Sequence, residues 1–165
     1  MTATTLARSL DAKDLPIAAA WAFERALRLN ELKPSDYVAL AFIYFNAGDF
    51  GYAAHHHLPQ EFVDPSDHLW KSTLERGMEI YPEASEIAFW MDFFASARHA
   101  DPDASRRLTE RLESSNDPLA GGFWGFAFLE RQDLRRDADA LLGECRKASS
   151  SRNRYVAGVL TTRLA

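Results

Sequence analysis

One segment, residues 34–65, most constrains what this chain can fold into. A proline and Ser35 open it, an apolar run follows over residues 36–47, and Gly48 breaks that run before a second short helix predicted over residues 50–58. Serine is a typical N-cap, and proline is tolerated in the first turn because the N–H that it lacks would have no partner there. The segment therefore predicts a helical hairpin.

The helix predicted over residues 36–47 is apolar on two faces. One face carries Tyr37, Leu40, Ala41 and Tyr44, and the other carries Val38, Phe42 and Phe45. A helix that is apolar on nearly all sides either lies between layers of other helices or lines a groove. Both alternatives are open for this helix.

Helical periodicity extends along the rest of the chain. Helices are predicted from Asp14 to about residue 30, from residues 65–67 to residue 81, from about residue 83 through residue 94, and over residues 104–114, 118–131, 134–147 and 152–164, with a weaker one over residues 2–12. No stretch indicates a strand. Because short turns between helices favour antiparallel neighbours, the sequence predicts an all-α fold of antiparallel helical hairpins in a single domain, residues 1–165.

The helix that begins near Asp14 has a wide apolar arc and a charged side. Ile17 and Trp21 are expected on the apolar arc, which faces the core, whereas Arg25 and Arg28 are expected in solvent.

Composition and charge narrow the class of protein. The chain is 47% hydrophobic and 26% charged, as in a soluble globular protein. Its net charge is −5, but residues 1–130 carry 11 Lys and Arg against 20 Asp and Glu, whereas residues 131–165 carry 8 against 4. The basic end is expected either to meet an acidic partner or to be attracted to the acidic body. Nucleic-acid binding is not expected, because phosphate contacts need an uninterrupted positive footprint.

Cysteine content and hydropathy indicate the compartment. The single Cys145 cannot form an intramolecular disulfide and suits a reducing environment. Residues 1–8 lack an apolar core of signal-peptide length, and no run approaches the roughly 18 apolar residues that span a bilayer. A cytoplasmic protein with no membrane association is expected.

The segment at residues 34–65 resembles a tetratricopeptide repeat, a two-helix unit of about 34 residues that stacks into a superhelix. The family's favoured residue types are matched by Tyr37, Leu40, Ala41, Tyr44, Gly48, Phe50, Ala53 and Pro65, whereas His57 departs from the pattern. Residues 118–147 match more loosely, through Gly125, Phe128 and Leu134. The starts at Pro34 and Pro118 lie 84 residues apart, which is not a multiple of the repeat length. The alternative is an irregular α-helical bundle.

The resemblance implies a partner-binding role for the first helix of each unit, which lines a concave surface in that family. Carried over by position, the lining consists of Val38, Phe42, Phe45, Asn46, Phe126, Leu129 and Glu130. An apolar lining suits an amphipathic helix or an extended apolar segment of another protein. In the alternative arrangement, the chain's own last helix, residues 152–164, caps the fold or fills this groove.

The residues that carry catalytic or metal chemistry form no convincing constellation. His55, His56 and His57 are neighbours on a predicted helix, where successive side chains point about 100° apart, so the three cannot converge on one ion. Cys145 is predicted to be a buried, inert thiol, and the carboxylates at helix starts, such as Asp101, are explained by capping. No catalytic residue, metal site or cofactor is predicted.

These observations favour a non-enzymatic protein–protein interaction module, either an adaptor or a dedicated inhibitor or immunity-type partner. The alternative is an α-helical metal-binding protein or enzyme that uses residues 55–57 and His68. A third hypothesis is a regulatory subunit whose basic C-terminal end docks on an acidic partner.

Overall fold

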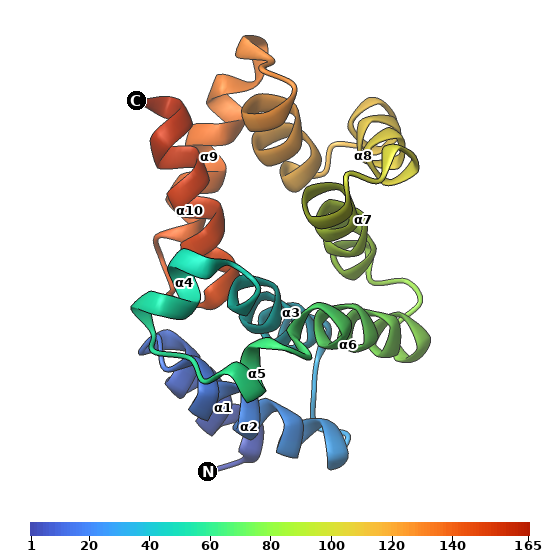
Figure 1. The fold of residues 1–165 in the computed structure, drawn as a ribbon. Helices are drawn as coiled ribbons and strands as arrows, with labels where there is room; N and C mark the ends of the chain where they lie inside the picture. Colours follow the sequence, from blue (N-terminus) through green and yellow to red (C-terminus); the bar gives the residue numbers. More distant parts are fainter. The chain divides into compact units, whose positions relative to one another are not determined.

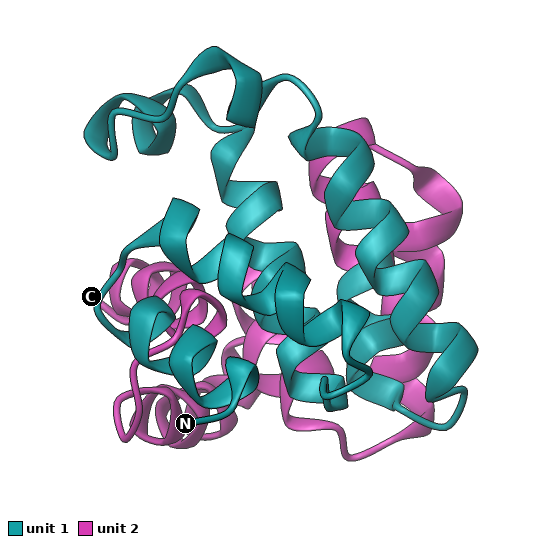
Figure 2. Ribbon diagram, turned by 90° about the horizontal axis from the view of Figure 1, so that it is seen from below, with its two compact units in different colours: residues 1–91 teal, residues 92–165 magenta.

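A computed structural model describes residues 1–165, and all of its regular structure is helical. The chain forms ten α-helices, one π-helix (η1) and one short 3-10 helix (η2), with no strand (Figure 1). The predicted all-α class is therefore confirmed. The sequence predicts one domain, and the structure divides the chain into two compact units, Met1–Met91 (unit 1) and Asp92–Ala165 (unit 2) (Figure 2).

The helices are numbered in chain order. Unit 1 contains α1 (Ala3–Ala12), α2 (Pro16–Arg28), α3 (Pro34–Ala47), α4 (Phe50–His55), α5 (Gln60–Val63) and α6 (Ser66–Ile80). The boundary between the units falls inside α7 (Ser85–His99). Unit 2 contains the end of α7 and α8 (Pro102–Ser114), η1 (Leu119–Phe128), η2 (Gln132–Leu134), α9 (Arg135–Cys145) and α10 (Ser151–Leu164). None of these helices is both long enough and apolar enough to cross a membrane.

Helix α3 is the centre of unit 1. Eleven of its 14 residues are buried, and it contacts α1, α2, α4, α5 and α6. Its main neighbour is α6, which lies beside it in Figure 1, whereas α1 packs on α2. The sequence places the hairpin partner of α3 at residues 50–58. The structure instead shows a six-residue α4 that buries none of its side chains, and its Phe50 is 88% exposed. The tetratricopeptide resemblance stays a prediction.

The start of α3 is capped by a different residue from the one predicted. Asp36, rather than Ser35, accepts a hydrogen bond from the Lys33 backbone N–H at 2.8 Å. The same buried carboxylate accepts two hydrogen bonds from the Arg8 guanidinium, at 2.7 and 2.8 Å. One aspartate therefore caps α3 and ties it to α1, which a serine hydroxyl could not do because it carries no charge.

Several helices end in a left-handed residue that is not glycine. Such residues, all with φ between 51° and 57°, are Asp14, Asn30, His57, Ala100 and Glu130. The sequence predicts that a helix begins at Asp14, but the Asp14 N–H donates to the Asp11 carbonyl at the end of α1, and α2 begins at Pro16 after Leu15. A left-handed residue lets the chain leave a helix while its last carbonyls stay hydrogen-bonded.

Unit 2 packs around η1, which contacts α8, α9 and α10. A helix is present where residues 118–131 predict one, but its hydrogen bonds have π-helical spacing, which is rare over ten residues. At its end, the Leu129 N–H donates to the Trp124 carbonyl, five residues back, at 3.1 Å. Helix α7 is tied to α8 by the buried Asp92, whose carboxylate lies 2.7 Å from the Arg107 guanidinium.

Candidate partner-binding surface

Three of the four residues predicted in unit 1 to line a partner groove lie inside the protein. Val38, Phe42 and Phe45 are at most 7% exposed, and only Asn46 is partly accessible. The Phe42 ring packs edge-on against Trp90, with 4.6 Å between ring centroids. Of the two alternatives left open by the sequence, groove or core, the structure places these three side chains in the core.

The residues predicted in unit 2 are split between core and surface. Phe126 is buried, whereas Leu129 is 39% exposed and Glu130 is exposed at the end of η1. The last helix, α10, packs on η1 and α9, and its Tyr155 ring lies 6.3 Å from that of Phe123. The structure thus gives the seven predicted residues no common open face within either unit, and their binding role stays a prediction.

The histidine segment is held by local contacts. His55 and His57 are exposed, and His57 adopts the left-handed conformation that ends α4. His56 is half-buried, stacks on Tyr52 with 4.3 Å between ring centroids, and places its Nε2 atom 3.4 Å from Asp14 Oδ2. No group of three His, Cys, Asp or Glu side chains has the geometry to hold a metal ion.

The other candidate chemical groups have structural surroundings. Cys145 is buried, as predicted. The Asp101 carboxylate caps α8 by accepting the backbone N–H groups of Asp103 and Ala104 at 2.9 and 3.3 Å, which confirms its predicted capping role. Glu86 accepts a hydrogen bond from the Trp90 indole at 3.1 Å.

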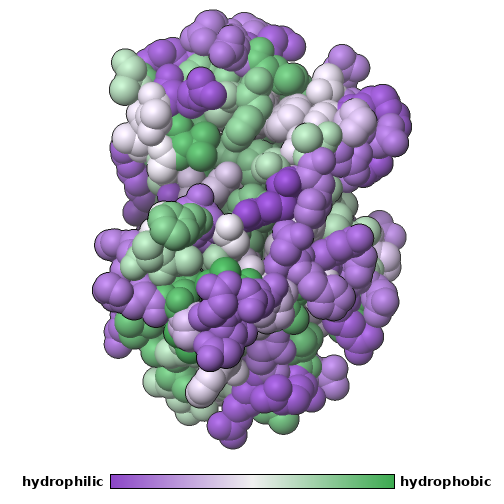
Figure 3. Space-filling model, viewed as in Figure 1, coloured by the Kyte–Doolittle hydropathy of each residue, from purple (hydrophilic) through white to green (hydrophobic).

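Several large apolar side chains reach the surface. On the face drawn in Figure 3, hydrophobic atoms are exposed among hydrophilic ones. The exposed large apolar residues are Met1, Leu6, Leu15, Trp21, Leu29, Phe50, Met78, Ile80, Phe128 and Leu129. Among them, Trp21 combines the largest ring system with 72% exposure, and it lies at a cleft.

This cleft, which we call the α2 cleft, has a volume of about 650 Å³ and lies entirely in unit 1. It is lined by Trp21, Glu24, Arg25, Arg28, Tyr44, Glu61, Phe62, Pro65 and Leu69. Helix α2 forms one wall, α5 and the start of α6 form the other, and α3 supplies Tyr44. The cleft therefore depends on the packing of four helices.

The floor of the α2 cleft is held by a partly buried hydrogen bond. The Tyr44 hydroxyl donates to Glu24 Oε1 at 2.7 Å, and the Tyr44 ring lies 5.9 Å from that of Phe62. Burial raises the pKa of Tyr44, and the hydrogen bond to Glu24 and that residue's negative charge raise it further. The phenol therefore stays protonated and keeps donating to Glu24 at neutral pH.

The charged groups at the rim of the cleft are not neutralised by each other. Arg25 and Arg28 on α2 make no ion pair or side-chain hydrogen bond, and neither does Glu61 on the opposite wall. Trp21, Arg25 and Arg28 are spaced by four and three residues, which places them along one face of α2. That face presents an exposed indole and two free guanidinium groups.

A smaller hollow of about 280 Å³ lies on the other side of Arg25. It is lined by Met1, Thr2, Ala3, Leu6, Ala22, Arg25, Leu29 and Glu31. Leu6 and Leu29 are 43% and 55% exposed. Arg25 thus lines both the α2 cleft and this smaller hollow.

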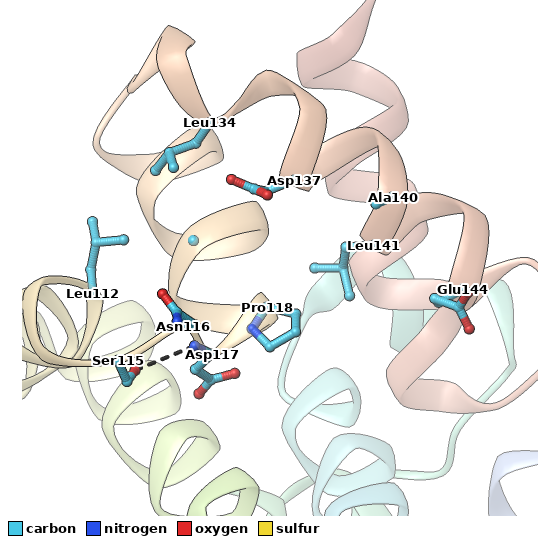
Figure 4. Close-up of a pocket in the computed structure, with 11 residues that line it drawn as sticks. Leu112, Ser115, Asn116, Asp117, Pro118, Leu134, Asp137, Ala140, Leu141 and Glu144 are labelled. Atoms are coloured by element: carbon cyan, nitrogen blue, oxygen red, sulfur yellow. Dashed lines mark hydrogen bonds between the residues drawn. The ribbon is translucent and has the colours of Figure 1, made fainter.

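Unit 2 has its own pocket, of about 400 Å³, beside the start of η1 (Figure 4). It is lined by Leu112, Ser115, Asn116, Asp117, Pro118, Gly121, Leu134, Asp137, Ala140, Leu141 and Glu144. In Figure 4, Leu112 from α8 and Leu141 from α9 lie on opposite sides of the start of η1. Asp117 accepts the Leu119 backbone N–H at 3.0 Å, so it serves as a helix cap. The lining holds no aromatic side chain and no cation.

The exposure of Trp21 is not evident from the sequence pattern. Trp21 lies four residues after Ile17, on the expected apolar arc, and four residues before Arg25, on the expected wet side. The prediction that Trp21 faces the core was therefore wrong. Its position at the border between the apolar and the charged side of the helix was the one sign in the sequence that it could be exposed.

Comparison of the chain with models of known protein families, with curated proteins and with solved structures finds no match. Its role has to be inferred from exposure, charge and shape. By these measures the α2 cleft, with an exposed aromatic ring and unpaired cations, is a stronger candidate than the unit 2 pocket.

Proposed function

We propose that the protein is a non-enzymatic protein–protein interaction module and that its partner binds at the α2 cleft. The exposure of Trp21 beside this cleft is the observation that carries the proposal. Tryptophan, tyrosine and arginine are the residues most enriched among those that dominate binding energy at protein interfaces. The cleft contains all three, in Trp21, Tyr44, Arg25 and Arg28.

Covering Trp21 is energetically favourable. Tryptophan buries about 150–250 Å² when it is enclosed, and apolar burial contributes roughly 25 cal/mol per Å². Because Trp21 is 72% exposed, a partner that encloses it gains roughly 3 kcal/mol from this side chain alone. That is enough to make Trp21 a dominant contact in an interface of ordinary size.

The cleft is prepared for binding because its floor is fixed before a partner arrives. Tyr44 belongs to the central helix α3, is 5% exposed, and is held by its hydrogen bond to Glu24. A rigid floor lowers the entropy lost on association. From Trp21 to Arg28 the exposed face of α2 extends roughly 10 Å, at 1.5 Å per residue. This length suits a helix or a short peptide segment of a partner.

Cross-linked affinity capture from the cells that make the protein tests this proposal. Three baits are compared: the unchanged chain, Trp21→Ala, and Phe50→Ala as a control that removes an even more exposed aromatic ring of unit 1 outside the cleft. At least one protein is expected to be recovered with the unchanged chain and with Phe50→Ala, and on the order of 100-fold less with Trp21→Ala.

Circular dichroism of the baits shows that each is folded. If every captured protein is recovered equally with Trp21→Ala and Phe50→Ala, the α2 cleft is not the binding surface. The identity of a Trp21-dependent protein then distinguishes an adaptor from a dedicated inhibitor.

A further inference from the structure

Arg25 and Arg28 are the two arginines of unit 1 that pair with no carboxylate. The exposed or half-exposed arginines at positions 8, 76, 106, 107 and 131 each lie within 3.0 Å of a carboxylate oxygen. Arg25 and Arg28 have no such partner, although the chain carries 24 acidic residues. Two free guanidinium groups beside an exposed tryptophan are therefore available to an outside ligand.

We infer, on the basis of the proposed function, that the partner segment is an acidic amphipathic α-helix. Its carboxylates pair with Arg25 and Arg28, and its apolar stripe packs against Trp21, Phe62 and Leu69 in the α2 cleft. Guanidinium groups bind carboxylates through two parallel hydrogen bonds, which gives both strength and orientation.

The spacing of the two arginines matches the spacing of side chains on a helix. Arg25 and Arg28 are three residues apart, so their side chains start about 5–6 Å from each other on the same face of α2. Acidic residues three or four positions apart on a partner helix have the same separation. A helix lying along α2 can therefore bring one carboxylate to each arginine.

The opposite wall of the cleft favours one orientation of the bound partner helix. Glu61, on α5, is exposed and makes no ion pair, and it faces the arginines across the cleft lining. Glu24 accepts a hydrogen bond from the Tyr44 hydroxyl and forms no ion pair with either arginine. An acidic stripe is attracted to the α2 wall and repelled from the α5 wall, which directs the helix and disfavours the reverse placement.

Selection from a displayed peptide library tests this inference. The library holds helix-forming peptides of about 15–20 residues, and the purified full chain is the target. Selected peptides are measured against Trp21→Ala, against the double variant Arg25→Glu/Arg28→Glu, and against Arg136→Glu, which reverses an exposed, unpaired arginine on α9. A fold check by circular dichroism accompanies each variant.

Trp21-dependent peptides are expected to carry Asp or Glu three or four positions apart beside an apolar stripe. The double reversal should weaken them on the order of 30-fold, while Arg136→Glu leaves them unchanged. Peptides with those acids replaced by lysine should bind the double variant better than the unchanged chain. Affinity should also fall as salt is raised, since the charges are near the surface.

Other outcomes overturn the inference. If the Trp21-dependent peptides are neutral or basic, or if the double reversal does not change their affinity, the partner is not an acidic helix. The proposed function is not affected by that result. If no selected peptide depends on Trp21, the helical partner is excluded, and the capture experiment decides the proposed function separately. A concentration-dependent dimer that Trp21→Ala abolishes in sedimentation identifies a second copy of the chain as the occupant instead.

Discussion

Three glycines in η1 lie in three different environments, which makes them a sensitive test of how unit 2 packs. A Cβ atom added at Gly122 would lie 2.8 Å from the Asp137 backbone oxygen in α9, closer than real Cβ atoms approach. A Cβ atom at Gly121 would meet nothing within 4 Å. The same substitution to alanine should therefore have opposite effects at two adjacent positions.

Gly122→Ala is expected to destabilise the protein because the backbone of α9 has to move away from η1. Overpacking of this kind costs about 1–3 kcal/mol, of which roughly 0.5–1 kcal/mol is offset by the lower entropy that alanine loses in a helix. The net loss is about 1–2 kcal/mol. Gly121→Ala has the entropic benefit without the clash, so it should stabilise by roughly 0.5–1 kcal/mol.

Urea denaturation followed by circular dichroism measures both variants. The two midpoints should move in opposite directions with unchanged slopes, because the surface exposed on unfolding is the same. Gly125→Ala provides a graded comparison: its Cβ would lie 2.5 Å from Leu134 Cδ1, the end of a side chain that can rotate away. Its cost should be smaller than that of Gly122→Ala. Equal effects at Gly121 and Gly122 would show that Gly122 does not face α9 and would refute the packing described for η1.

Two further predictions concern unit 1. Phe42→Ala should lower the free energy of unfolding by about 3–5 kcal/mol because the Phe42 ring is fully buried. Phe50→Ala should change the free energy of unfolding by no more than about 0.5 kcal/mol. Equal changes for the two variants in urea denaturation would contradict the core placement of Phe42. Tyr44→Phe should flatten the loss of stability at alkaline pH. The folded-state pKa of Tyr44 is raised, so its contribution is complete below the unfolded value of about 10 and declines above it, where only the unfolded chain releases the proton. Stability curves of both proteins from about pH 9 to pH 11 check this, and parallel curves would rule it out.

The sequence predicts which segments are helical more reliably than it predicts which helices meet. The run over residues 36–47 is apolar on both faces, and α3 is buried on all sides as that pattern requires. Helix α3 packs mainly on α6 rather than on the next helix, since α4 has only six residues and buries none of them. Local periodicity cannot predict which helices pack together, because tertiary packing determines this.

The residues that cap and end the helices are also hard to predict from the local sequence. Ser35 and Asp36 are both good capping residues, and the sequence gives no reason to prefer the second. In the structure Asp36 accepts the Lys33 N–H, and Arg8, 28 positions earlier, binds the same carboxylate. His57 looks like part of a histidine cluster in the sequence, but its left-handed backbone makes it the residue at which α4 ends.

The segment at residues 34–65 still supplies the candidate site, but from its other face. Sequence analysis assigns partner binding to the side of α3 that carries Phe42, which the structure buries against Trp90. Tyr44 is two residues further on and therefore points to nearly the opposite side of the helix. There it forms the floor of the α2 cleft, next to Phe62 from the same segment. A central helix that is apolar on both faces can serve two purposes at once, with one face closing the core and the other supporting a surface whose exposed contacts, Trp21 and Arg25, come from a neighbouring helix.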